Sequence, residues 1–363
     1  MPVWKVSAAM NTVTVKIRPH AEKFTAEEDA ALRRAGSVIR NGGLVAFPTE
    51  TVYGLGGDAL NRESSRKIYA AKGRPSDNPL IVHICRLEDM EKITCRVPEE
   101  AFRIAEVFWP GPLTMILHKA GVVPSETTGG LDTVAVRFPS DKTAGKLIEY
   151  SGGYIAAPSA NRSGRPSPTL AKYVAQDMDG RIDMIIDGGQ VGIGLESTIL
   201  DLTVSPPQIL RPGYVTKEML SRVLKEIDTD VTILTADSGQ APRAPGMKYR
   251  HYAPKGELTI VEGSLDAVVQ YINGKTAAEQ EQMERTGVIC TSESSLRYSA
   301  DVVKCVGSRG DEESVARNLF SALREFDDEC VTKIYTESFE TAGLGQAIMN
   351  RLLKAAGYRV VQV

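Results

Sequence analysis

Short apolar runs rich in β-branched residues alternate with helix-length segments along most of this chain, and this alternation constrains the fold most strongly. The first part of the chain contains seven such runs, at 44–47, 79–84, 113–118, 133–138, 154–157, 184–187 and 197–202. Helix-length segments occur at 64–72, 98–108, 141–150 and 170–178. Thr25 and Glu28 form a capping box before a further helix that ends near Asn41. The pattern predicts an α/β domain with a sheet of about seven strands.

The same alternation continues from residue 257 to the last residue, with longer helical segments. Strand-like runs lie at 257–263, 287–292, 301–307, 332–338 and 358–363, and helical segments at 265–273, 312–326 and 345–356. Strands that alternate with helices of this length are typical of a parallel sheet covered on both faces. We therefore expect a second, Rossmann-like domain with a doubly wound parallel sheet.

The length of the chain, 363 residues, also favours two domains, because single cores rarely grow past about 250–300 residues. Residues 218–256 contain three Ala-Pro dipeptides and the cluster Lys-Tyr-Arg-His-Tyr at 248–252, which indicates an extended, fairly stiff connection. The expected division is 1–217 for the first domain, 218–256 for the linker and 257–363 for the second domain.

The charge balance argues against an extended surface for nucleic acid or anionic lipid. The chain has 43 basic and 46 acidic residues, a net charge of −3. It has no uncharged apolar stretch of about 18 residues, and Lys5 and Lys16 interrupt the start, so we expect a cytoplasmic protein without a membrane span. Five widely spaced cysteines without a CxxC pair predict neither a disulfide framework nor a zinc site.

The common nucleotide-binding motifs GxxxxGK[ST] and GxGxxG are absent, but polar clusters follow several expected strands. The segment 48–57, PTETVYGLGG, places two threonines and three glycines after the first strand, as a ligand loop or as a decorated turn. The segment 72–79 offers Lys72 and Arg74, which could bind a phosphate or form a solvated basic turn.

Two ionisable residues stand inside apolar runs. His83, in PLIVHI, is either a hydrogen-bonded core residue or a participant in chemistry. Arg137, in TVAVRF, requires an anionic partner, because an unpaired buried charge costs several kcal/mol. That partner could be a carboxylate of the protein or of a substrate.

Three later clusters complete the candidate site. Ser159, Asn161, Ser163 and Ser167 lie in a proline-interrupted loop, Ser197 begins a strand, and Arg211 follows another apolar run. Together, the three arginines at strand ends predict a pocket that gathers anionic groups. The sequence contains neither an HExxH metal motif nor a GxSxG nucleophile elbow.

These clusters resemble the L-threonylcarbamoyladenylate synthases, the YrdC-like family in its long form with an extra C-terminal domain. The resemblance covers nearly the whole chain and rests on blocks at 48–56, 72–84, 109–114, 130–139, 155–169, 187–199, 210–213, 244–254 and 347–357. The pairs Lys72/Arg74 and Ser159/Asn161 are similar to the family's signature. The resemblance implies an open, twisted, mixed sheet with helices for the first domain.

The family makes L-threonylcarbamoyl-AMP and pyrophosphate from L-threonine, bicarbonate and ATP, the first step toward N6-threonylcarbamoyladenosine at position 37 of tRNAs that read ANN codons. The resemblance thus implies a nucleotidyltransferase whose product passes to the tRNA threonylcarbamoyl-transfer enzymes. The resemblance does not exclude a weak direct contact between this protein and tRNA. Mg²⁺ would arrive with ATP, since the sequence shows no carboxylate cage for it.

The resemblance also implies roles for individual residues, with Lys72 and Arg74 as catalytic residues. Threonine would be bound by Thr51, His83, Arg137, Ala157 and Ser197. ATP would be bound by Arg74, Asn78, Thr133, Ser159, Asn161, Ser167, Arg211, Arg250 and His251. No residue is expected to bind a metal directly, and the linker would fold over the site.

Two alternatives remain at this stage. The basic site could bind RNA as a module without catalysis, because local patches bind tRNA even on an acidic protein. The second domain lacks a glycine fingerprint and clustered catalytic residues, so we expect a lid or structural role there, with a separate regulatory domain as the other possibility.

Overall fold

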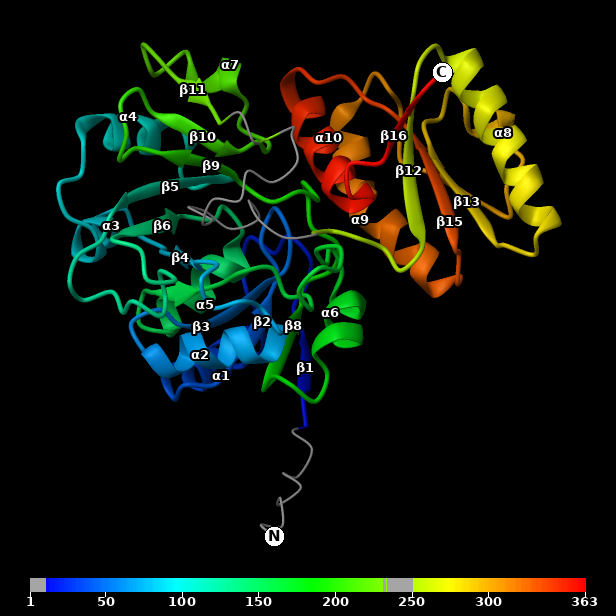
Figure 1. Cartoon of the computed structure of the whole chain (residues 1–363). Helices are drawn as coiled ribbons and strands as arrows, with labels where there is room; N and C mark the ends of the chain where they lie inside the picture. Colours follow the sequence, from blue (N-terminus) through cyan, green and yellow to red (C-terminus); the bar gives the residue numbers. More distant parts are fainter. Residues whose placement is uncertain (1–10, 231–232, 234–250) are drawn as a thin grey trace, which may run out of the picture.

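The computed structural model describes residues 11–230, 233 and 251–363, which form two sheets with their helices (Figure 1). The first sheet is mixed and has eleven strands, and the second is parallel and has five. The predicted α/β class, with a mixed sheet followed by a parallel one, is confirmed. No helix in the described ranges has the length and apolar character that a membrane crossing requires.

The first sheet has the strand order β1-β8-β2-β3-β7-β4-β6-β5-β9-β10-β11. Its strands are β1 (Val13–Lys16), β2 (Val45–Phe47), β3 (Gly54–Asp58), β4 (Ile81–His83), β5 (Leu113–His118), β6 (Thr133–Arg137), β7 (Ile155–Ala156), β8 (Met184–Asp187), β9 (Thr198–Asp201), β10 (Gln208–Arg211) and β11 (Asp228–Thr229). The seven expected runs all form strands. The estimate of about seven was too low, because β1, β3, β10 and β11 also pair with the sheet.

The glycine-rich segment after β2 is the clearest local difference from expectation. It forms β3, antiparallel to β2, instead of a loop that approaches a ligand along its whole length. A Cβ atom on Gly56 would lie 2.8 Å from Ile155 and 2.9 Å from Phe47. Glycine at this position therefore allows strands and side chains to pack closely, and Gly54 alone among the β3 glycines reaches the cavity described below.

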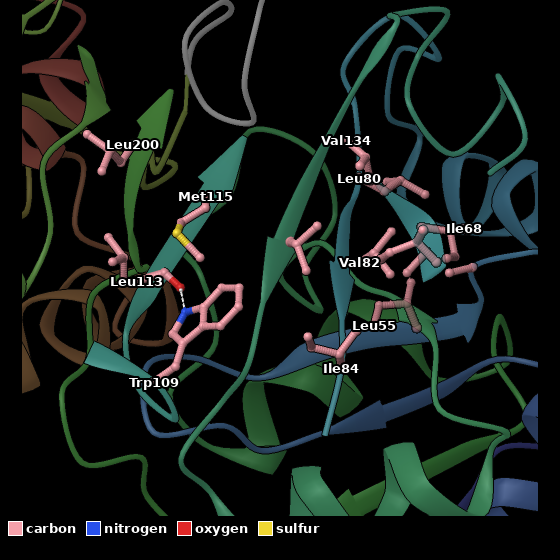
Figure 2. Close-up of a cluster of buried hydrophobic side chains, with 14 of the residues drawn as sticks. Leu55, Ile68, Leu80, Val82, Ile84, Trp109, Leu113, Met115, Val134 and Leu200 are labelled. Carbon is pink, nitrogen blue, oxygen red and sulfur yellow. Dashed lines mark hydrogen bonds between the residues drawn. The ribbon is translucent and has the colours of Figure 1, made fainter. Parts of the chain in front are cut away.

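Helices cover both faces of the first sheet. They are α1 (Ala26–Arg40), α2 (Arg62–Lys72), α3 (Glu88–Ile93), α4 (Glu99–Phe108), α5 (Lys142–Tyr150), α6 (Ala171–Met178) and the short α7 (Lys217–Leu220). The predicted capping box is present, with Thr25 accepting from the Glu28 amide. Helices α1 and α5 pack on one face, and α2, α3, α4 and α6 contribute to the core on the other. Figure 2 shows part of that core, where the Trp109 indole donates to the Leu113 carbonyl at 2.7 Å.

The second domain has the strand order β14-β13-β15-β12-β16, with every pair parallel. Its elements are β12 (Glu257–Glu262), α8 (Leu265–Glu281), β13 (Thr286–Cys290), η2 (Ser295–Arg297), β14 (Val302–Cys305), α9 (Glu312–Asp328), β15 (Lys333–Glu337), α10 (Gly343–Ala356) and β16 (Val360–Gln362). Helix α8 lies on one face, and α9 and α10 lie on the other, toward the first domain (Figure 1). This is the doubly wound arrangement that the sequence predicts.

Buried charges join the two domains. Arg324 of α9 is fully buried and donates to both carboxylate oxygens of Asp177 on α6, at 3.0 and 2.7 Å, and twice to the Pro166 carbonyl. Arg165 also pairs with Asp177, so this carboxylate has two cationic partners. The apolar core of the second domain continues into the first through Val52 and Leu195. The second domain therefore packs directly on the segments that carry the candidate site.

The segment predicted as a linker begins as part of the first domain. Helix α7 starts at Lys217, and β11 pairs in parallel with β10 at the edge of the first sheet. At its other end, the Ala253 amide donates to the Gly164 carbonyl at 2.9 Å, and the Lys255 amide donates to Asp327 at 2.6 Å. The described ends of this segment thus contact both domains.

We expect Arg324→Ala to lower the free energy of unfolding by about 3 kcal/mol, because it removes one cation from a carboxylate that is buried. Asp177 keeps Arg165, which places the loss at the lower end of the usual range. Urea denaturation measures the change. Arg66→Ala, which removes exposed pairs with Glu63 and Glu126, is the matched control and should cost less than about 1 kcal/mol. Equal losses in the two variants would contradict the importance of the buried pair.

Candidate functional site

A cavity opens above the centre of the first sheet, with about 590 Å³ of space between protein atoms, including the part open to solvent. Eleven of the residues predicted for the site line it: Thr51, Arg74, His83, Arg137, Ala157, Ser159, Asn161, Ser167, Ser197, Arg211 and His251. They come from strand ends and loops that are far apart in sequence.

The register of the strands explains why these residues meet. His83 of β4 lies beside Arg137 of β6, and Arg137 lies opposite Thr114 of β5. Thr114 pairs with Ile199 of β9, and Ile199 lies opposite Arg211 of β10, directly after a register shift between Ile209 and Arg211. Neighbouring residues in register project from the same face of a sheet. One row across five adjacent strands therefore supplies both arginines and the histidine.

Arg137 occupies one end of the cavity and is almost completely buried. Its Nη1 donates to the Thr51 hydroxyl at 2.9 Å, and the Thr51 and Thr49 hydroxyls lie 2.9 Å apart. Because the Thr49 hydroxyl donates to the Val52 carbonyl at 2.7 Å, the Thr51 hydroxyl donates to Thr49 and accepts from Arg137. Glu50 forms an ion pair with Nη2 at 2.8 Å. Of the two partners that the sequence left open for Arg137, the protein thus supplies a carboxylate of its own.

His83, beside Arg137, is held in its neutral form. Burial, and then the charge of Arg137, lower its pKa to about 3. Its Nδ1 lies 3.1 Å from the Ile81 carbonyl, which can only accept, so Nδ1 carries the proton. The Nε2 atom is consequently the basic nitrogen, and it can accept a hydrogen bond.

Arg74 occupies the other end of the cavity. Gly73, with φ of +62°, ends α2 in the left-handed conformation and turns the chain so that Lys72 and Arg74 point in different directions. The Arg74 guanidinium donates to the Asn78 carbonyl, to Asn78 Oδ1 and to the Pro79 carbonyl, at 3.1, 2.5 and 3.0 Å. Burial lowers its pKa to about 10, so it stays charged at neutral pH. Asn78 does not line the cavity, and it orients Arg74 instead.

Lys72 lies behind the cavity wall and does not line it. Its Nζ donates to the carbonyls of Ser159 and Asn161, both at 2.5 Å, and lies 3.4 Å from Asn161 Oδ1. Burial lowers the pKa of this amine well below its usual value. The Lys72 amine is therefore directed at the loop that carries Ser159 and Asn161. This geometry fits a positioning residue for that loop and gives no support to the direct catalytic role expected for Lys72.

Arg211 and Ser197 lie together and also line the cavity. Arg211 donates to the Ser197 carbonyl at 3.0 Å and to its hydroxyl at 3.1 Å, and that hydroxyl lies 2.8 Å from the Thr114 hydroxyl. Burial lowers the pKa of Arg211 to about 10. A third guanidinium that is charged at neutral pH thus faces the same cavity.

The sequence analysis missed Glu196, which lines the cavity beside Ser197. Its Oε1 accepts from the Ser167 hydroxyl at 2.5 Å, and its Oε2 accepts from Arg351 of α10 at 2.8 Å. Burial alone would raise the pKa of Glu196, but Arg351 and Arg211 outweigh it and lower the pKa. Arg351 stands in an apolar helical segment, the same signal that singled out Arg137, and could have been found that way.

Three further predicted site residues are His251 and Arg250 of the linker and Thr133 of β6. His251 lines the cavity, and burial lowers its pKa to about 3. Its neighbour Tyr252, which was not predicted, also lines the cavity and stacks on Phe320 of α9 with ring centroids 5.2 Å apart. Arg250 lies outside the described residues. Thr133 lies at the first residue of β6, four residues before Arg137, and does not line this cavity.

The side chains that line the cavity do not form a carboxylate cage for a metal ion. Glu196 is the one carboxylate among the described lining residues, and Ser167 and Arg351 occupy both of its oxygens. Mg²⁺ prefers several oxygen ligands in octahedral geometry. The described residues therefore do not fit a metal site that the protein alone supplies.

Comparisons with known proteins agree along the whole chain. A family model described as Telomere recombination matches residues 37–213, and one described as Threonylcarbamoyl-AMP synthase, C-terminal domain, matches residues 215–357. The threonylcarbamoyl-AMP synthase of Pyrococcus abyssi is 49% identical over 352 residues, which cover 97% of this chain and 100% of the relative. The synthase of Bacillus subtilis is 49% identical over 335 residues, covering 92% and 95%.

A solved structure supports the same relationship. The crystal structure of Pyrococcus abyssi Sua5 complexed with L-threonine matches with a TM-score of 0.91 and 48% identity. The match covers 97% of this chain and 100% of that chain. Both the fold and the order of the domains are therefore shared with a protein that binds threonine.

Because His83 is buried in its neutral form, we expect the free energy of unfolding to fall in acid. Because its folded pKa of about 3 lies below the ordinary value of 6.5, the unfolded state takes up a proton first as the pH falls through this window. We expect the protonation of His83 in the unfolded state to lower the free energy of unfolding by about 2 kcal/mol between pH 7 and pH 5. Guanidinium denaturation at both pH values should show a smaller loss for His83→Gln than for the wild type. His118→Gln, on a half-buried histidine outside the cavity, should behave like the wild type.

Proposed function

Since the chain belongs to the threonylcarbamoyl-AMP synthase family, with both domains of its long form, we propose that it makes L-threonylcarbamoyl-AMP from L-threonine, bicarbonate and ATP, with release of pyrophosphate. The observation that carries the proposal is one cavity lined by three guanidinium groups, in a chain that matches these synthases over nearly its full length. Arg137 and Arg211 are buried, and Arg74 is half-buried. An amino-acid carboxylate and a triphosphate are the anions that such a cavity would receive together.

The end of the cavity at Arg137 suits threonine. The guanidinium can take the carboxylate with two parallel hydrogen bonds. Neutral His83 has Nε2 as an acceptor for the threonine hydroxyl, and the hydroxyls of Thr51 and Ser197 add polar partners. Ala157 offers a small apolar contact for the threonine methyl group. A site that pairs with the hydroxyl rejects valine more strongly than one that relies on shape alone.

The end at Arg74 and Arg211 suits the nucleotide. Both guanidinium groups would offset phosphate charge, and Ser159, Asn161 and Ser167 would donate to the nucleotide from their loop. Asn78 and Lys72 support this end from behind, through Arg74 and the 159–161 loop. Thr133, Arg250 and His251 remain proposed ATP contacts, with Thr133 farther along β6 and His251 in the cavity wall.

The proposed chemistry has two steps. The threonine amine adds to the carbon of bicarbonate with loss of water and forms a carbamate. A carbamate oxygen then attacks the α-phosphorus of ATP, and the bond to pyrophosphate breaks. Neither step requires a covalent bond to the protein, so the task of the cavity is to orient the reactants and to stabilise the developing negative charge.

Mg²⁺ would come with ATP, held by phosphate oxygens and water, because Glu196 is already engaged by Ser167 and Arg351. When bound, it would neutralise phosphate charge. The product would pass in the cytoplasm to the enzymes that transfer the threonylcarbamoyl group to tRNA. The charge balance of the chain suits a small-molecule enzyme, and direct tRNA binding would be weak.

A pyrophosphate-release assay tests the function. We expect the purified protein to release pyrophosphate from ATP when threonine, bicarbonate and Mg²⁺ are all present, and to stop when any one of them is left out. Valine and serine in place of threonine should each give much slower release, because valine lacks the hydroxyl and serine lacks the methyl group. Release that is independent of threonine would contradict the proposal, and tRNA binding without any release would favour the RNA-binding alternative.

Two arginine variants test the division of the cavity. Arg137→Ala should raise the KM for threonine about 30-fold or more and change the KM for ATP little, because a buried charged hydrogen-bonding partner is worth about 2 kcal/mol or more. Arg74→Ala should lower kcat and raise the KM for ATP, with the threonine KM within about threefold of the wild type. Arg103→Ala, on the exposed face of α4, is the control. The same loss toward both substrates in both variants would contradict the two-ended site.

A further inference from the structure

The ion pair between Arg137 and Glu50 has an unusual geometry for a buried pair. The closest atoms, Nη2 and Oε1, are 2.8 Å apart, and the two side chains are 5% and 12% exposed. Even so, the pair makes no hydrogen bond, since neither Glu50 oxygen nor Arg137 Nε or Nη2 has a hydrogen-bond partner in the described structure. The contact is therefore an ion pair without a hydrogen bond.

The free donors of Arg137 form a recognition surface. Nη1 is engaged by Thr51, whereas Nε and Nη2, which lie side by side on the guanidinium edge, have no acceptor among the described residues. Parallel hydrogen bonds from two such nitrogens are the preferred way for arginine to take a carboxylate. Glu50 thus neutralises Arg137 without using the two donors that a substrate carboxylate would need.

Glu50 approaches Arg137 from outside the substrate cavity. It does not line that cavity and instead lines a second one at the domain boundary, together with Ser140, Glu313 and Arg317. The charge of Glu50 also acts on Asp141, at the start of α5. Burial, and to a smaller extent Glu50, raise the pKa of Asp141 to about 6. A negatively charged Glu50 therefore acts on Arg137 from behind the substrate site.

We propose that Glu50 is a resident counter-ion of Arg137 and that it limits the affinity of the site for the amino-acid carboxylate. A buried guanidinium without an anion is costly, so Glu50 stabilises the protein before substrate arrives. An incoming carboxylate on Nε and Nη2 shares the same cation and is repelled by Glu50. Glu50 is thus a positioning residue that holds the Arg137 guanidinium in place and weakens threonine binding. This inference rests on the proposed function.

The test is the dissociation constant for threonine, measured by isothermal titration calorimetry without ATP or bicarbonate. The wild-type titration comes first: if the wild type does not bind threonine, the proposed function fails. If it binds, Glu50→Gln should bind threonine at least about threefold more tightly, because the repulsion is gone. Unchanged or weaker binding in Glu50→Gln overturns the counter-ion role, and weaker binding would point to a contact between Glu50 and the substrate ammonium group.

Controls separate this role from a structural one. Glu313→Gln removes a carboxylate that faces the same second cavity and should leave the threonine dissociation constant unchanged. Without threonine, Glu50→Gln should melt at a lower temperature than the wild type, and saturating threonine should raise its melting temperature by more. A merely structural Glu50 would lower the melting temperature without tightening the binding.

A second variant keeps the inference testable if Glu50→Gln does not fold. Glu50→Asp keeps the charge and withdraws it by one methylene from Arg137 Nη2. Its dissociation constant for threonine should lie below that of the wild type, by a smaller factor than expected for glutamine. An equal or higher value would overturn the inference by itself.

Discussion

Burial of arginine is the constraint on which this structure depends, because a guanidinium inside a protein must be compensated by anions or by oriented acceptors. Arg324 meets the requirement on the Asp177 carboxylate and the Pro166 carbonyl of the first domain. Arg351 meets it on Glu196 of the first domain and on Asn350 Oδ1 of its own helix, so both arginines join the two domains. Arg137 meets it differently, with an ion pair that leaves two donors free. These two donors distinguish Arg137 from the arginines that join the domains.

The mixed sheet brings the residues of the cavity together. Strand pairing, with a register shift between Ile209 and Arg211, places His83, Arg137, Thr114 and Arg211 along one row, although they are separated by long stretches of sequence. Burial, and then the positive charge of Arg137, lower the pKa of His83 and keep it neutral. Electrostatics and topology are therefore coupled, and the site gains a neutral acceptor beside a permanent cation.

Local patterns predicted most of the fold and much of the site. The seven expected runs of the first sheet, the helices and the parallel second sheet follow from periodicity and capping, which are local properties. Strand β3 was missed because its glycines are poor strand formers, and their value lies in close packing against Ile155 and Phe47. The motifs located Arg74, Arg137 and Ser197. Whether Lys72 faces the cavity or the loop behind it depends on long-range geometry, and so does the pairing of Glu196 with Arg351.

The loop that carries Ser159, Asn161 and Ser167 shows how these constraints combine. From the first domain, Lys72 holds the carbonyls of Ser159 and Asn161. From the second domain, Arg324 holds the Pro166 carbonyl, and Arg351 holds the carboxylate that accepts from Ser167. A loop without regular hydrogen bonding has many conformations to lose, so such anchors reduce the cost of ordering it around a ligand. The buried basic side chains of both domains thus hold in place the donors that the cavity presents.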